Sequence, residues 1–141
     1  MISVIRIKGD VGLNKKVRET LYRLRLRRKY SCIVINPTKE QLDRIKKVKN
    51  FVAFGEINKE VLKNLIEKRG QLIDKKKSKP KTEEVIKALE NKKKIQELNL
   101  KPFFRLHPPR KGIESKKHFG VGKGDLGDIQ EKINDLIERM L

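Results

Sequence analysis

Residues 20–37, TLYRLRLRRKYSCIVINP, predict the local structure around which this chain is built. Leu21 and Leu24 continue the apolar face of a helix that begins upstream. Residues 32–35 are a short continuous apolar run, typical of a covered sheet strand, and Asn36 with Pro37 ends it as a turn. Between the helix and the strand lie five cations in seven residues: Arg23, Arg25, Arg27, Arg28 and Lys29. The stretch therefore predicts a compact core that presents dense positive charge where a helix meets a strand.

The flanking sequence predicts an alternating order of strands and helices. Strands are expected near residues 2–8, 31–35 and 51–55, and helices near residues 14–26, 38–48 and 58–69. In the first strand, Ile2 and Val4 alternate with Ser3 and Arg6, so one face of this strand is expected to be covered. The expected fold class is α/β, in the form of an α+β sandwich with a β-α-β-α-β core and a three-stranded sheet.

Local signals mark the helix ends. Asn14 and Asn58 are expected to cap the first and third helices, and Thr38 with Gln41 matches a capping box at the second. Gly70 is expected to end the third helix in the left-handed conformation.

Composition changes divide the chain into three parts. Residues 1–72 are expected to form the core, and residues 73–100 a basic linker with a short helix that starts at Thr82. Residues 101–141 are expected to form an aromatic and basic extension, followed by a helix over residues 125–141 that packs on the core. Asp125 and Asp128 are expected to lie near the start of that helix, where its dipole favours them.

The net charge of +19 indicates a polyanionic partner. The sequence has neither an apolar run of membrane-spanning length nor a signal-peptide pattern, so we expect a cytoplasmic protein with no membrane partner. The single cysteine excludes an internal disulfide, and Cys32 is expected to be a small buried apolar residue.

Residues 101–124, KPFFRLHPPRKGIESKKHFGVGKG, combine prolines and glycines with aromatic and basic residues and have no periodicity. We expect an extension without regular structure that becomes fixed on a partner.

Patterns typical of catalysis or cofactor binding fail in detail. Residues 120–124, GVGKG, differ from a Walker loop because Lys117 stands where its first glycine belongs and Gly124 replaces the hydroxyl residue that would hold magnesium. His107 and His118 are too poorly supported by carboxylates to indicate a metal pair. No nucleophile with a base emerges, so we expect no enzyme activity, cofactor or small-molecule substrate.

RNA recognised by shape and backbone fits the charge pattern better than DNA read by a recognition helix. Arginine suits bidentate phosphate contacts and base stacking, while lysine supplies a point charge. The candidate RNA-binding residues are Lys15, Lys16, Arg23, Arg25, Arg27, Arg28, Lys29, Arg105, His107, Arg110, Lys111, Lys116, Lys117, His118 and Lys123.

Two segments resemble a known family. Residues 20–38, TLYRLRLRRKYSCIVINPT, resemble the helix–strand signature of the family of large-subunit ribosomal protein thirty. Residues 104–106 (FRL), 109–112 (PRKG) and 124–127 (GDLG) are similar to the C-terminal part of its archaeal and eukaryotic branch, and the chain looks like the archaeal type. The resemblance implies a ferredoxin-like core with strand order 3-1-2. It also implies a structural role on large-subunit rRNA, near the five-S rRNA region, beside other ribosomal proteins.

Two other classes of function remain open at this point. One is a free-standing RNA-binding regulator or chaperone, which would not stay with the large subunit in moderate salt. The other is an enzyme acting on RNA, which the absence of a catalytic pattern disfavours.

Overall fold

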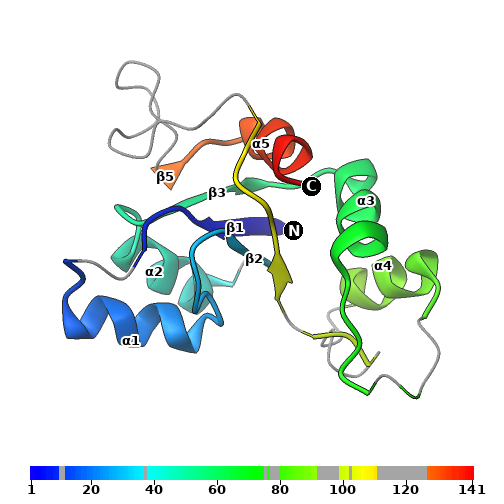
Figure 1. Cartoon of the computed structure of the whole chain (residues 1–141), viewed down its shortest axis with the longest axis horizontal. Helices are drawn as coiled ribbons and strands as arrows, with labels where there is room; N and C mark the ends of the chain where they lie inside the picture. Colours follow the sequence, from blue (N-terminus) through cyan, green and yellow to red (C-terminus); the bar gives the residue numbers. More distant parts are fainter. Residues whose placement is uncertain are drawn as a thin grey trace.

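The computed structural model describes residues 1–9, 12–36, 38–74, 76, 80–91, 99–101, 103–110 and 127–141 (Figure 1). Its elements in chain order are β1 (Ile2–Arg6), α1 (Lys15–Arg23), β2 (Ser31–Ile35), α2 (Lys39–Lys47), β3 (Val52–Glu56), α3 (Lys59–Arg69), α4 (Thr82–Glu90), β4 (Phe104–Arg105), β5 (Gly127–Asp128) and α5 (Lys132–Met140). The strands and helices expected over the first 69 residues are all present. None extends more than one residue beyond its predicted bounds.

Strand β1 lies at the centre of the sheet and pairs antiparallel with β2 and β3, placing Val4 opposite Ile33 and Phe54. The order β3-β1-β2 that the resemblance implies is confirmed, and the α+β arrangement is consistent with a ferredoxin-like core. The expected number of three strands is wrong, because the described residues form five. Strand β4 pairs antiparallel with β2, and β5 pairs parallel with β3, so each edge of the central sheet is extended by a two-residue strand.

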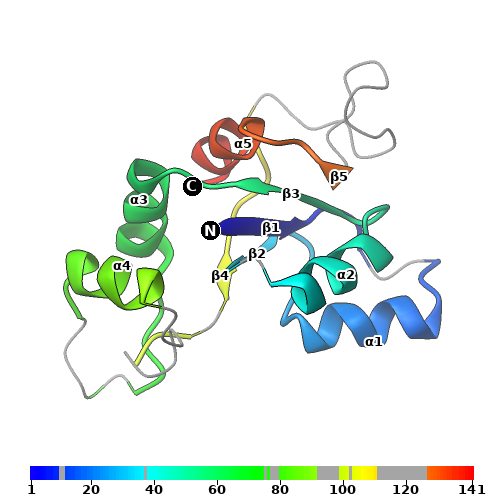
Figure 2. The same ribbon diagram turned by 180° about the vertical axis from the view of Figure 1, so that it is seen from behind.

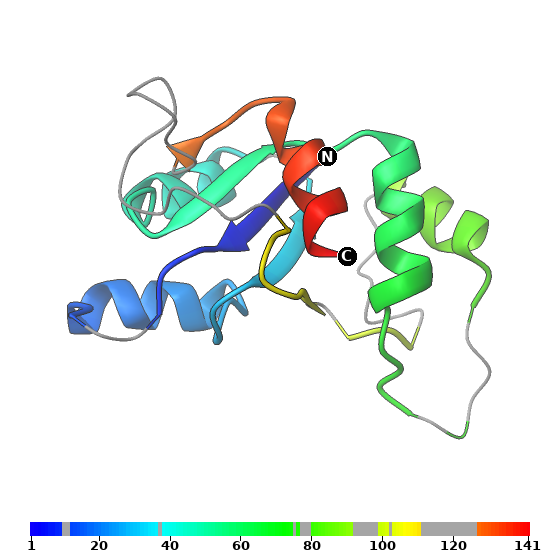
Figure 3. The same cartoon turned by 45° about the horizontal axis from the view of Figure 1, so that its top comes forward.

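Helices cover both faces of the sheet (Figures 1 and 2). Val4 and Ile33 pack with Leu21 of α1 and Ile45 of α2 on one face. On the opposite face, Ile5 belongs to a second cluster that includes buried residues of α3, α4 and α5, with α5 lying over the sheet (Figure 3). The expectation of one covered face for the first strand is therefore wrong.

The two polar residues that were expected on the outer face of β1 are buried. Ser3 is 0% exposed and Arg6 is 1% exposed. Ser3 lies on the side of α5, where its hydroxyl bonds the thiol of Cys32 at 3.1 Å. Arg6 alternates to the side of α1, where its guanidinium bonds backbone carbonyls of the chain.

The predicted helix caps form at the first three helices. The side-chain oxygen of Asn14 accepts from the N–H of Lys16, that of Thr38 from Gln41, and that of Asn58 from Val61. The reciprocal half of the capping box is not made, because the buried Oε1 of Gln41 has no hydrogen-bond partner among the described residues.

Gly70 ends α3 for a reason other than the one expected. Its φ is −64°, so the residue is not left-handed. A Cβ at this position would lie 2.5 Å from the carbonyl oxygen of Ile66, which accepts the N–H of Gly70. Glycine is therefore needed because two stretches of backbone come close together.

Helix α5 begins at Lys132, so the expected helix over residues 125–141 starts too early. Gly127 and Asp128 instead pair with β3, and the N–H of Ile129 continues the contact to the carbonyl of Phe54. Asp128 is thus a strand residue, and Asp125 lies outside the described residues. Four residues of α5 are buried: Ile133, Leu136, Ile137 and Met140.

The described part of the extension is held by the protein itself. Phe104 and Arg105 form β4, and the N–H of Leu106 donates to the carbonyl of Tyr30 at 3.1 Å. The N–H groups of His107 and Arg110 then donate to carbonyls of Met140 and Arg139. For residues 103–110, the expectation of an irregular segment fixed by a partner is therefore corrected: this part joins the sheet and follows the end of α5. Residues 111–126 lie outside the described residues.

Among the described residues, the helices are too short and too polar to span a lipid bilayer.

Candidate nucleic-acid interface

The connection between α1 and β2 is a helix-ending turn with a defined backbone. Leu24 caps α1, the N–H of Arg25 donates to the carbonyl of Tyr22 at 3.0 Å, and the N–H of Leu26 donates to the carbonyl of Leu21 at 2.9 Å. These two bonds and the left-handed Arg25 make a Schellman motif, whose apolar contact here joins Leu21 and Leu26 in one buried cluster. We call residues 23–29 the basic turn.

Arg25 occupies the position of this motif where glycine is favoured. Its φ of 65° lies in the left-handed region, which costs a residue with a Cβ about 1 kcal/mol or more. An arginine at this position is therefore unfavourable for the fold, which indicates that its side chain serves another purpose.

A buried arginine of β1 holds the backbone of the basic turn against the sheet. Nη1 of Arg6 donates to the carbonyl of Leu26 at 3.0 Å, and Nε donates to the carbonyl of Lys8 at 2.9 Å. The carbonyl of Arg6 accepts the N–H of Tyr30 at 2.7 Å. The middle of the basic turn, at Leu26, and the residue that follows it, Tyr30, are thus bonded to the same residue of the central strand.

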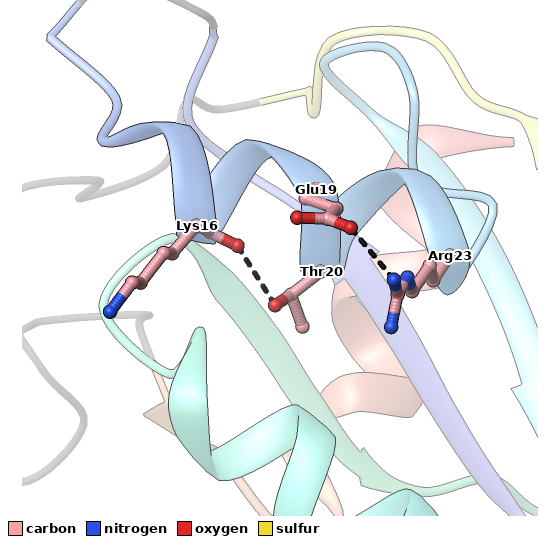
Figure 4. Close-up of polar contacts among 4 residues, drawn as sticks. All are labelled: Lys16, Glu19, Thr20 and Arg23. Atoms are coloured by element: carbon pink, nitrogen blue, oxygen red, sulfur yellow. Dashed lines mark hydrogen bonds and ion pairs between the residues drawn. The ribbon is translucent and has the colours of Figure 1, made fainter.

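Within the basic turn, apolar and basic side chains point in opposite directions. Leu24 and Leu26 are buried, whereas the five cations of the turn are all exposed. Figure 4 shows that Arg23 is paired with Glu19 one helical turn earlier, at 2.7 Å. Residues 20–39 contain no acid, and within the described part of the chain no ion pair engages the other four cations: Arg25, Arg27, Arg28 and Lys29. Four exposed cations on a fixed backbone are therefore available to an anionic ligand.

Sheet pairing adds Arg105 to this surface. Arg105 lies opposite Ser31, the first residue of β2, immediately after the basic turn. Its neighbour Phe104 is buried with the cluster on the α5 side, so Arg105 alternates to the face that carries α1. Its exposed guanidinium lies 5.7 Å from the ring centroid of Phe103.

The remaining predicted residues are spread over other parts of the chain. Lys15 and Lys16 are exposed at the start of α1, and Figure 4 shows Lys16 two helical turns before Arg23. His107 and Arg110 are exposed beside the C-terminal end of α5. The other five, Lys111, Lys116, Lys117, His118 and Lys123, lie outside the described residues.

Two residues that build this interface, the buried Arg6 and the exposed Tyr22, were not found by sequence reasoning. Arg6 was placed on the exposed face because of its charge, although its spacing of two residues from Val4 puts it on the covered face of a strand. Tyr22 was passed over, although it falls outside the apolar stripe of Val17, Leu21 and Leu24. An aromatic residue that lies off the buried stripe, at the start of a run of basic residues, is a signal that could have found it.

The described residues do not form a reactive cysteine or a metal-binding cluster of the kind found in enzyme sites. Cys32 is fully buried, and desolvation raises the pKa of its thiol to about 12, partly offset by the bond with Ser3. A neutral thiol of this kind is a poor nucleophile. Within the described ranges, no group of three or more His, Cys, Asp or Glu side chains converges as a metal site.

Comparisons with known proteins agree with the resemblance. The family described as "Ribosomal protein L30p/L7e" matches residues 2–52. The chain is 42% identical to "Large ribosomal subunit protein uL30" of Archaeoglobus fulgidus, over 99% of each chain. It is 40% identical to the protein of the same name from Methanococcus maripaludis, over 99% of this chain and 98% of the relative. For the protein of that name from Nanoarchaeum equitans, the identity is 40% over 100% of this chain and 99% of the relative. At this identity over nearly the full length of each protein, the chain belongs to the ribosomal protein L30p/L7e family.

Proposed function

We propose that this chain is a structural component of the large ribosomal subunit and binds rRNA through the basic turn and Arg105. The names of its relatives, which cover nearly the full chain at about 40% identity, support the ribosomal role. The observation that carries the RNA-binding part is a turn whose backbone is fixed by the Schellman motif and by Arg6. Four exposed cations of this turn have no acidic partner among the described residues. No reaction is proposed, since members of a ribosomal protein family serve a structural role.

The mechanism is neutralisation of the RNA backbone. Cations of the basic turn replace counterions condensed on phosphates, and release of those ions favours binding. Because the turn is already held by Arg6 and the Schellman motif, little backbone entropy is lost when it meets the RNA. Arginine guanidinium groups add bidentate hydrogen bonds to phosphate oxygens.

Other predicted residues form a second contact in this proposal. His107 and Arg110 are exposed beside α5, and they lead into the segment that holds Lys111, Lys116, Lys117, His118 and Lys123. We propose that residues 111–124, which follow the part held by the protein itself, reach between RNA helices, near the five-S rRNA region and beside other ribosomal proteins. Lys15 and Lys16 extend the contact along α1. The division into a core of residues 1–72, a linker of 73–100 and an extension of 101–141 stays a prediction, as does residence in cytoplasmic ribosomes.

Sedimentation of a cell lysate that contains the tagged chain tests the ribosomal role. The chain is expected to co-migrate with the large subunit and to remain there in moderate salt. Recovery at the top of the gradient, with no association in low or moderate salt, contradicts the proposal and favours a free-standing RNA-binding protein.

A further inference from the structure

Tyr22 is an exposed aromatic residue next to the basic turn. Its side chain is 50% exposed, and among the described residues only Ile73 is another large apolar side chain of comparable exposure. The guanidinium of Arg27 lies over its ring, 5.3 Å from the centroid. The structure thus presents an aromatic ring and a guanidinium together on the surface where RNA is proposed to bind.

Packing of the core does not explain this position. Leu21 and Leu24 fill the buried face of α1, whereas Tyr22 points away from it and is in neither apolar cluster. The backbone of Tyr22 is nonetheless fixed, since its carbonyl accepts the N–H of Arg25 in the Schellman motif. A ring held on rigid backbone loses little freedom when a ligand stacks on it.

We propose that Tyr22 and Arg27 form a stacking site for an unpaired nucleobase of the bound RNA. The exposed part of the phenol ring offers a π-face, which every base can use. The guanidinium of Arg27 lies against the same ring and can meet the phosphate beside that base. Arg23 and Arg25, which follow Tyr22 within three residues of the chain, are also exposed, so an anionic ligand fits this site better than an apolar segment of a protein. This inference rests on the proposed function and names the kind of RNA feature that the site takes, a base outside a duplex.

Tyrosine fluorescence gives a direct test, because the chain has two tyrosines and no tryptophan. In the Tyr30→Phe variant, Tyr22 is the sole tyrosine and its emission reports on the proposed site. Addition of hexaadenylate is expected to quench that emission saturably. A hexamer of abasic ribose phosphate, which has the charge but no bases, is expected to bind without quenching.

Variants at Tyr22 give a second measurement by anisotropy of end-labelled oligomers. Tyr22→Leu keeps apolar bulk but loses the ring, and its affinity for hexaadenylate is expected to fall about tenfold, in the range found for loss of one base–aromatic stack. Its affinity for the abasic hexamer is expected to stay as in the wild type. Tyr22→Phe retains the ring and is expected to bind both oligomers normally.

The stacking site is contradicted if Tyr22→Leu binds hexaadenylate as tightly as the wild type, or if the abasic hexamer quenches equally. In either case, the proposed function still holds if the wild type binds rRNA fragments and charge reversal in the basic turn abolishes that binding. If the wild type binds neither oligomer nor rRNA fragments, both proposals fail.

Discussion

Nη1 of Arg6, a buried cation in the central strand, donates a hydrogen bond of 3.0 Å to the backbone carbonyl of Leu26 in the basic turn. The guanidinium is removed from water, and backbone carbonyls take the place of solvent around it. A buried cation, Arg6, thus holds the backbone of the basic turn, and the exposed cations of the turn lie on the surface.

Replacement of Arg6 tests this support. Arg6→Met keeps similar length but removes the donors, leaving the carbonyl oxygens of Leu26 and Lys8 without them. The free energy of unfolding is expected to fall by about 1–3 kcal/mol, measured by urea denaturation. Arg6→Lys, which keeps the charge but cannot reproduce the planar fork, is expected to lose less. Equal stability of Arg6→Met and the wild type would show that the hydrogen bonds from Arg6 to the carbonyls of Leu26 and Lys8 do not stabilise the fold.

Arg25→Gly is expected to stabilise the protein while weakening RNA binding. Glycine removes the conformational cost of a left-handed residue with a Cβ, but it loses more backbone entropy on folding. The free energy of unfolding is therefore expected to rise by about 0.5–1 kcal/mol. The affinity for rRNA fragments is expected to fall about fivefold, as for the loss of about 1 kcal/mol of binding free energy.

Arg27→Gly is the matched control in the same turn. It also removes one cation, but Arg27 is not among the residues with positive φ. Its stability is therefore expected to stay level or fall in the same urea titrations. If both glycine variants change stability in the same direction, the conformational cost assigned to Arg25 is wrong.

Gly55 in β3 is expected to tolerate no side chain. A Cβ there would clash with the backbone carbonyl of Gln130, in the segment that joins β5 to α5. Gly55→Ala is expected to lower the free energy of unfolding by about 1–3 kcal/mol, since backbone must shift on one side of the contact. Gly9→Ala, whose Cβ would meet nothing within 4 Å, is the control and is expected to be nearly neutral. Thermal unfolding of the two variants provides the comparison.

The pKa of Cys32, raised to about 12 by burial, predicts a pH dependence of stability. The unfolded thiol loses its proton near its ordinary pKa of 9.0, while the folded thiol keeps its proton up to about pH 12. Between these values the unfolded chain binds fewer protons, so the contribution of Cys32 is full below pH 9 and is lost as the pH rises. The stability difference between the wild type and Cys32→Ala is expected to shrink across this window. A difference that stays constant from pH 8 to pH 11 contradicts the assignment.

Local signals predicted the parts of the fold that depend on nearby residues. Asn14, Thr38 and Asn58 cap helices within three residues of themselves, so their roles could be predicted from short patterns. The two-residue strands β4 and β5 could not be predicted, because each is too short for any periodicity and forms only where it meets an exposed sheet edge. Gly70 was assigned to the correct helix end but to the wrong conformation, since a glycine at a helix end does not specify its φ, and the close approach of the Ile66 carbonyl is seen only in the backbone geometry.

In the candidate interface too, features that depend on neighbouring residues were predicted, and features that depend on residues distant in sequence were not. The cations of the basic turn are adjacent in sequence, so their clustering was predicted without a structure. Arg105 joins them through strand pairing across more than seventy residues, and only the register of β2 with β4 shows its place. Arg6 was placed outside because of its charge, although alternation puts it on the same face as Val4, and sequence alone cannot reveal the backbone carbonyls that accept its hydrogen bonds there.

The central claim is that the basic turn binds large-subunit rRNA, and the salt dependence of binding tests it most directly. The dissociation constant for an rRNA fragment is measured across a range of salt concentrations for the wild type and two triple variants. One variant carries Arg25→Glu, Arg27→Glu and Arg28→Glu. The other carries Lys63→Glu, Lys68→Glu and Lys87→Glu on α3 and α4, where the three lysines are also exposed. Each set changes the net charge from +19 to +13, so the two variants have equal net charge and differ in where the charge is lost and in whether arginines or lysines are replaced.

The account predicts that the turn variant binds much more weakly and has a smaller slope of log K against log salt, because fewer counterions are released. The control variant is expected to keep nearly the wild-type slope, and both variants are expected to fold, since exposed charges contribute about 0–1 kcal/mol each to stability. Equal losses of affinity and slope in the two variants would contradict the account, because binding would then depend on net charge rather than on the basic turn.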